Sequence, residues 1–170
     1  AASAEPTTLH VTDRDEMLAV EDILIGDVWI AHGQSNMGWG IGSTVRYDLA
    51  VPSADGLPLL RHFGVASNTH ATVQDNLPPD GVQQGGWVVS NRDTVRDVTA
   101  IGHHFGTTLQ QALQIPIGII CNSRGGASIE SMVPAYKFPE HPITEAYFAD
   151  LQQRMADFDH RAEALKKWER

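Results

Sequence analysis

Two short polar segments of the sequence combine residue types that can carry out acyl transfer. The first, AHGQSNMGWG (31–40), places Ser35 between a glutamine and an asparagine, directly after an apolar run. The second, NSRGGASIE (122–130), contains the pair Gly125 and Gly126, again after an apolar run. A serine becomes a nucleophile when a tight turn exposes its hydroxyl, backbone amides face the developing oxyanion, and a base takes its proton.

We therefore interpret Ser35 as a candidate nucleophile. Gly33 allows a sharp turn before it, and the amides of Ser35 and of Gly125 or Gly126 are candidate oxyanion donors. The pattern differs from the G-x-S-x-G elbow, because Met37 stands where the second glycine is required. A polar turn closed by a structural glycine pair is the alternative, and spacing alone leaves both interpretations open.

The apolar patterns predict the elements that position these segments. Alternating or continuous apolar runs predict strands within 7–12, 17–25, 27–31, 57–67, 86–90 and 115–123, and helical spacing predicts helices over 97–114 and 144–168. The first two strands are expected to form a hairpin with DRDE as its turn, and 66–86 is expected to be a long loop. We expect 27–31 to be buried on both faces, and Asp97 to serve as N-cap or first-turn acid.

The order of these elements indicates an α/β fold. Strands that alternate with helices form a parallel sheet covered by helices. Such sheets carry their sites at the carboxyl ends of the strands, where both polar segments fall.

Composition narrows the possible partners. The 170 residues, 42% hydrophobic, suit one domain of ordinary size. The net charge of -9, from 21 acidic and 12 basic residues, argues against nucleic acid and anionic membranes as partners, and no apolar run could span a bilayer. A single Cys121 excludes an internal disulfide and a cysteine-cluster metal site, and we expect neither a metal nor a cofactor.

The first residues bear on the compartment. AASAEP fits the small-residue remnant of a cleaved export signal, which favours a periplasmic or secreted protein, although an artificial start would look similar.

Two blocks resemble a known family. GDVWIAHGQSNM (26–37) resembles the first block of the SGNH hydrolases, specifically the sialate O-acetylesterase and related carbohydrate acetylesterase group. FGTTLQQALQIPIGIICNSRGGASIESM (105–132) resembles the helix, strand and oxyanion glycine block of the same group, and the likeness covers 17–135. The resemblance implies a three-layer α/β/α fold with a mainly parallel, flavodoxin-like sheet that is incomplete in this chain.

The resemblance also implies a function. Ser35 would be the nucleophile of a serine esterase that removes O-acetyl groups from sialic acid or a polysaccharide, without a cofactor. Gly125 or Gly126 would supply an oxyanion amide, and the neighbouring Gln34, Asn36 and Arg124 are candidate substrate contacts. The group usually has an aromatic residue at the place of Arg124, and often tryptophan at that of Met132, so acyl or sugar contacts are expected to differ. Arg124 suits a sugar carboxylate, and a surface arginine is the alternative.

Two further blocks of the group, a Gly-Glu-Ser-Asn-like stretch and an Asp-x-x-His motif, are not found. Asp157 and His160 have the right spacing, but they lie inside the predicted last helix. His32 adjoins the serine turn and could line the site. The pair His103 and His104 lies on a predicted helix, where we expect one surface and one partly buried histidine.

We therefore expect 26–170 to be the N-terminal portion of an SGNH esterase domain, and 1–25 to be N-terminal strands or the end of a β-rich module. A second polypeptide, or a missing C-terminal part, would carry the two absent blocks and the base, and would cover the open edge of the sheet. The alternative function is a non-catalytic carbohydrate-binding relative that has lost the base.

Overall fold

The computed structural model describes residues 1–14, 16–66 and 86–157. The strands are β1 (Ser3–Asp13), β2 (Glu16–Ile25), β3 (Asp27–Gly33), β4 (Leu60–Gly64), β5 (Val88–Val89) and β6 (Ile117–Ser123), and the α-helices are α1 (Ser35–Gly38), α2 (Tyr47–Ala54), α3 (Ala100–Leu113) and α4 (Pro142–Asp157). Short 3-10 turns lie at Ile41–Ser43, Val95–Asp97, Ile129–Met132 and Ala135–Glu140. The chain divides into two compact units, Ala1–Gly126 and Ala127–Arg170, and the first contains both Ser35 and the glycine pair.

The first two strands form the predicted hairpin. β1 and β2 pair antiparallel, and Asp13 faces Glu16 across the turn. How 1–25 relates to a larger β-rich module stays a prediction.

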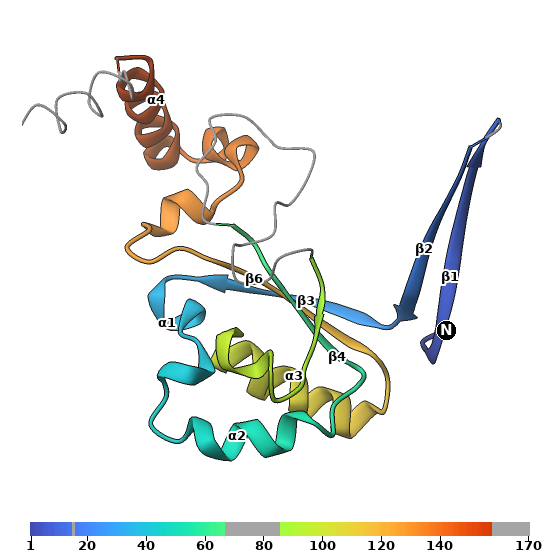
Figure 1. The fold of residues 1–170 in the computed structure, drawn as a ribbon. Helices are drawn as coiled ribbons and strands as arrows, with labels where there is room; N and C mark the ends of the chain where they lie inside the picture. The colour runs from blue at the N-terminus through green and yellow to red at the C-terminus, as the bar shows by residue number, and fades with distance from the viewer. Residues whose placement is uncertain (15, 67–85, 158–170) are drawn as a thin grey trace, which may run out of the picture. The chain divides into compact units, whose positions relative to one another are not determined.

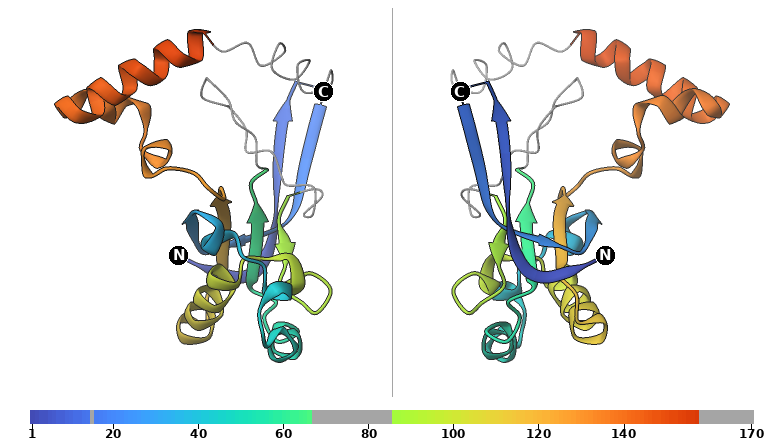
Figure 2. Two further views of the ribbon diagram at one scale, coloured as in Figure 1. Left: turned by 90° about the vertical axis from the view of Figure 1, so that its left-hand side faces the viewer. Right: turned by 90° about the vertical axis from the view of Figure 1, so that its right-hand side faces the viewer.

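A four-stranded sheet forms the centre of the first unit, in the order β3-β6-β4-β5 (Figures 1 and 2). β6 runs parallel to both β3 and β4, whereas β5 adds antiparallel to β4. The predicted mainly parallel sheet is thereby confirmed, and β6, which pairs with both β3 and β4, is the strand predicted within 115–123.

The helices α1, α2 and α3 lie on one side of this sheet (Figure 1). Glycines allow α3 to approach closely, since a side chain at Gly106 would come within 2.6 Å of Leu60 Cδ1 and 3.1 Å of Ile119 Cγ1. The core beneath α3 consists of Leu57, Leu60, Ile117 and Ile119, and a second cluster consists of Ile41, Ala50, Ala54, Val95, Val98 and Ala100.

Two sequence predictions about local environment were wrong. Run 27–31 is not buried on both faces: Val28 is 59% exposed and Ile30 67%, because β3 is an edge strand of the described sheet and no described helix covers that face. Asp97 does not cap α3; Thr99 does, and its side chain accepts a hydrogen bond from the Gly102 amide.

The second unit contains α4, which begins at Pro142 and confirms the start of the last predicted helix. Phe138, 4% exposed, stacks on Phe148 with ring centroids 5.0 Å apart and so holds the preceding 3-10 turn against α4. The predicted remainder of this helix, 158–168, and most of the predicted loop 66–86 lie outside the described residues. Among the helices that are described, none has the length and apolar character needed to cross a bilayer.

Candidate active site

Pairing of β3 with β6 brings the two polar segments together. Gly33 and Ser123 are partners in the parallel register, and the Arg124 amide donates a hydrogen bond to the Gly33 carbonyl oxygen at 2.9 Å. Both strands therefore end at the same edge of the sheet. A Cβ placed on Gly125 would lie 3.7 Å from the Ser35 Cβ, so the serine and the glycine pair are neighbours in space.

Residues 33–38 form a turn, which we call the nucleophile turn after the role predicted for Ser35, and Ser35 is exposed on its surface. The Gln34 carbonyl oxygen accepts hydrogen bonds from the amides of Met37 at 3.1 Å and Gly38 at 3.2 Å, which closes the single turn of α1 with Ser35 as its exposed first residue. A side chain at Gly38 would overlap the Ser123 hydroxyl group. Glycine at this position therefore lets the turn lie against the end of β6.

One residue of the glycine pair, Gly126, has a backbone conformation that favours glycine. Gly126 has a φ of +76°, in the left-handed region that a β-branched residue rarely adopts, and no heavy atom lies within 4 Å of where its Cβ would be. Gly125 and Gly126 are both exposed. Both glycines are therefore accessible to solvent, and Gly125 lies beside Ser35.

Three further predicted site residues lie next to Ser35 or the glycine pair in the sequence. Gln34 and Asn36 are exposed on either side of Ser35, and Arg124 is exposed directly before Gly125. The structure thus gathers all six predicted site residues at the carboxyl ends of two adjacent strands; their roles stay predictions.

The histidines fall into two groups. His32 is exposed, and its Nδ1 lies 2.7 Å from the Asn122 carbonyl oxygen. A carbonyl can only accept, so Nδ1 carries the hydrogen and the lone pair of the neutral ring is on Nε2. His104 is exposed, as predicted for one member of this pair, whereas His103 is buried more completely than the predicted partly buried histidine. His160 lies outside the described residues.

Buried imidazoles on the helix-covered side of the sheet are unsuited to act as the base. Burial lowers the pKa of His62 to about 3 and that of His103 to about 4, and both rings are closed to solvent. Within the described residues, no hydrogen bond joins an imidazole to the Ser35 hydroxyl. The described part of the chain also lacks any cluster of three or more potential metal ligands.

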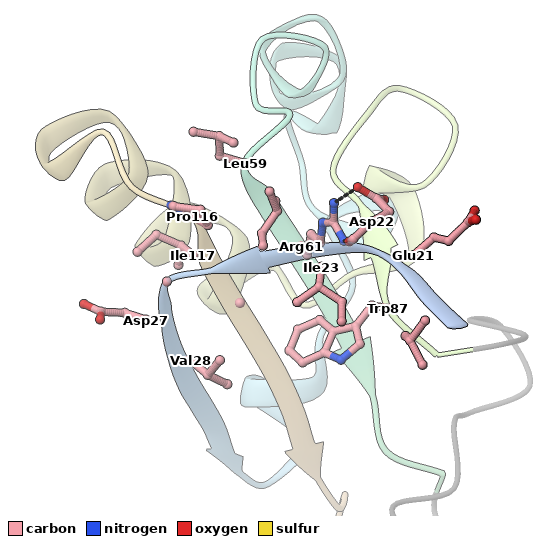
Figure 3. Close-up of a pocket in the computed structure, with 14 residues that line it drawn as sticks. Glu21, Asp22, Ile23, Asp27, Val28, Leu59, Arg61, Trp87, Pro116 and Ile117 are labelled. Carbon is pink, nitrogen blue, oxygen red and sulfur yellow. Dashed lines mark hydrogen bonds and ion pairs between the residues drawn. The ribbon is translucent and has the colours of Figure 1, made fainter. Parts of the chain in front are cut away.

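A separate cavity lies away from the serine site. A space of about 570 Å³ opens at the amino ends of β3 and β6, lined by residues that include Asp27, Ile117 and Trp87 (Figure 3). Arg61 crosses it and donates hydrogen bonds to the Asp22 carbonyl oxygen at 2.7 Å and to its Oδ1 at 2.8 Å. The seven residues of β3 span about 20 Å, and this strand lies between the cavity at its amino end and Ser35 after its carboxyl end. It is therefore a separate feature from the serine site.

Sequence reasoning missed Thr99, whose Oγ1 donates a hydrogen bond to the Met37 carbonyl oxygen in the nucleophile turn. A threonine directly before the first apolar residues of a helix is an N-cap signal, and it could have been preferred over Asp97.

Fold and site geometry together describe an α/β protein with a serine turn and a glycine pair at the carboxyl ends of neighbouring parallel strands. No protein-family model matches the chain. A solved carbohydrate acetylesterase from Xanthomonas citri is similar, with a TM-score of 0.72 and 33% identity over 81% of this chain and 30% of that chain.

Curated relatives specify the group further. Sialate O-acetylesterases from Mus musculus, Rattus norvegicus and Homo sapiens are 29%, 31% and 28% identical over 66%, 66% and 67% of this chain. The resemblance to the sialate O-acetylesterase group, and with it the SGNH hydrolase fold, is confirmed. The chain spans about a fifth of the length of these curated relatives, 21% or 22% in each case.

Proposed function

We propose that this chain supplies the nucleophile and the oxyanion amides of a carbohydrate O-acetylesterase. The observation that carries the proposal is the proximity of Ser35 and Gly125 at the carboxyl ends of β3 and β6. The relatives named above support the choice of substrate class, an O-acetylated sugar such as sialic acid or a polysaccharide unit.

The reaction is a two-step acyl transfer. The Ser35 Oγ attacks the acetyl carbonyl carbon while a base takes the hydroxyl proton, and the amides of Ser35 and of Gly125 or Gly126 donate to the oxyanion. Collapse of the intermediate breaks the ester bond, and the sugar oxygen leaves with the proton returned by the base. Water then attacks the acetyl group on Ser35 and releases acetate. Gln34, Asn36 and Arg124 would contact the sugar.

We infer that the base, a histidine with its aspartate, comes from a second polypeptide or a C-terminal part beyond this sequence. Among the described residues no strand pairs with the outer edge of β3, which supports this inference, because Val28 and Ile30 expose apolar side chains there. On the helix-covered face, an apolar cavity of about 210 Å³ borders the same strand, lined in part by Trp29 and Phe105, which are 44% and 42% exposed. A strand added parallel to β3 would cover these side chains, and its carboxyl end would lie beside Ser35.

The test is acetate release from 4-nitrophenyl acetate and from an O-acetylated sugar. It compares this chain alone, the completed assembly (this chain with the part that carries the base) and the assembly with Ser35→Ala. We expect little hydrolysis by the chain alone, clear hydrolysis by the assembly, and background rates for Ser35→Ala.

Each other outcome has a distinct meaning. Full activity of the Ser35→Ala assembly would remove Ser35 as nucleophile. Full activity of the lone chain would contradict an external base and point to His32 or His160. Sugar binding by an assembly that never hydrolyses the ester would favour the carbohydrate-binding alternative.

A further inference from the structure

Thr99 connects the start of α3 to the nucleophile turn through one hydroxyl group. The residue is buried, 4% exposed, and is the N-cap of α3. Its Oγ1 donates to the Met37 carbonyl oxygen at 2.5 Å and accepts from the Gly102 amide at 3.3 Å. The hydroxyl therefore acts as a donor to one element and as an acceptor from another.

The nucleophile turn depends on such an outside donor. α1 has only one turn, and the last carbonyls of a helix have no amide partner within it. Neighbouring backbone bonds fasten the following residues to the same segment: the Ala100 amide donates to the Trp39 carbonyl oxygen at 2.8 Å, and the Ile41 amide donates to the Val98 carbonyl oxygen at 3.0 Å. Thr99 contributes the only side-chain hydrogen bond to α1 that the described residues show.

Packing fixes the position of the Thr99 side chain. A Cβ on Gly102 would come within 2.5 Å of the Thr99 Cγ2 and 2.9 Å of the Ile119 Cγ2, so the glycine leaves room for the threonine methyl group between helix and sheet. α3 is itself held against β6 at this point. A continuous series of contacts therefore links the sheet, α3, Thr99 and the turn that carries Ser35.

We propose that Thr99 is a positioning residue for Ser35, which holds α1 at the place where the serine lies beside Gly125. The proposal rests on the proposed function of Ser35. Because Thr99 is buried beneath the turn, loss of its hydroxyl is expected to lower kcat and to leave KM nearly unchanged. A displacement of about 1 Å at a reacting group costs on the order of 10²-fold in rate.

The test uses three variants and two measurements. Thr99→Val removes the hydroxyl with little change of shape, Thr99→Ser keeps it, and Thr107→Val makes the same change two turns later on α3, where Oγ1 lies 3.5 Å from His103 Nε2. Amide hydrogen exchange at Met37 and Gly38 reports on the turn, and kcat and KM are measured in the completed assembly with Ser35→Ala as reference.

For Thr99→Val we expect exchange at both amides to be about tenfold faster or more, and kcat to fall by about tenfold or more, with KM within about twofold. Thr99→Ser should restore both, and Thr107→Val should leave both unchanged. Wild-type exchange and kcat in a folded Thr99→Val would overturn the proposal. An equal effect of Thr107→Val would reduce Thr99 to a general stabiliser of α3.

Two further outcomes separate this proposal from the proposed function. Full hydrolysis by Ser35→Ala would end the role of the serine, whereas the exchange measurement would still report whether Thr99 orders the turn. If Thr99→Val does not fold, the exchange of the Thr99 hydroxyl proton with solvent is measured in the wild-type protein instead. Slow exchange would support the hydrogen bond to the Met37 carbonyl oxygen and with it the proposal, whereas fast exchange would contradict both.

Discussion

Acidification is expected to destabilise the protein through two buried histidines. His62 on β4 and His103 on α3 stack with ring centroids 5.6 Å apart, and the residues are only 2% and 1% exposed. Both ring nitrogens of His62 lack a hydrogen-bond partner within the described residues. The pKa of His62 is lowered to about 3 and that of His103 to about 4, chiefly by burial and to a smaller extent by a neighbouring imidazole, that of His103 and His104 respectively.

The size of the effect follows from linkage. Each imidazole has an ordinary pKa of 6.5, so below that pH the unfolded chain binds protons that the folded protein excludes, and the free energy of unfolding falls as pH falls. At pH 5 each histidine costs about 2 kcal/mol relative to pH 8, since pH 5 is about 1.5 units below 6.5 and each unit is worth about 1.4 kcal/mol. Together they cost about 4 kcal/mol, a large share of the ~5–15 kcal/mol typical of a domain.

The loss is measured by urea unfolding at pH 8, 6 and 5. Replacing His62 with leucine removes one of the two groups, so the fall in unfolding free energy between pH 8 and pH 5 should shrink by about half, to roughly 2 kcal/mol. His10→Gln, at an exposed position on β1, should leave the fall unchanged and serves as control. The reasoning would be refuted if the unfolding free energy fell equally in wild type and His62→Leu, or if it did not fall in wild type.

Two more substitutions test the packing and the site. Gly106→Ala should lower the unfolding free energy by about 1–3 kcal/mol, because its Cβ would approach Leu60 Cδ1 to 2.6 Å, whereas Gly56→Ala, with an ordinary 3.7 Å contact, should have a much smaller effect in the same urea titration. Gly125→Val in the completed assembly should reduce kcat by about 10²–10³-fold, because a branched side chain beside Ser35 would displace the oxyanion amide or the substrate. Thermal stability should change little, since the added Cβ would make only an ordinary contact of 3.7 Å with the Ser35 Cβ. Unchanged kcat in a folded variant would leave the glycine pair a purely structural role.

The strands and the helices α3 and α4 could be predicted from sequence because each has its own periodicity, whereas α2 was not predicted. The β-branched run that became β6 and the helical spacing of α3 are local signals that tertiary packing reinforced. Burial of β3 was mispredicted for a reason that is not local. Val28 and Ile30 are apolar, but whether they are covered depends on what pairs beyond the edge of the sheet.

The location of the candidate site could be predicted from sequence because the topology of the sheet determines it. Ser35 and Gly125 follow strands that pair in parallel, and carboxyl ends of parallel strands meet at one edge. The link from Thr99 to Met37 joins residues 62 positions apart, and no sequence periodicity signals such a hydrogen bond. The stacking of His62 on His103 is equally non-local, because it depends on which strand lies beneath α3.

The central claim is that Ser35 is the nucleophile, and covalent labelling tests it most directly. The completed assembly is treated with a serine-directed fluorophosphonate, and the adduct is located by peptide mass spectrometry, with and without an O-acetylated sugar as competitor. We predict one adduct per chain on the peptide that contains Ser35, slower labelling in the presence of the sugar, and no adduct in Ser35→Ala. Labelling at another residue, with Ser35→Ala labelled as fast as wild type, would contradict the claim.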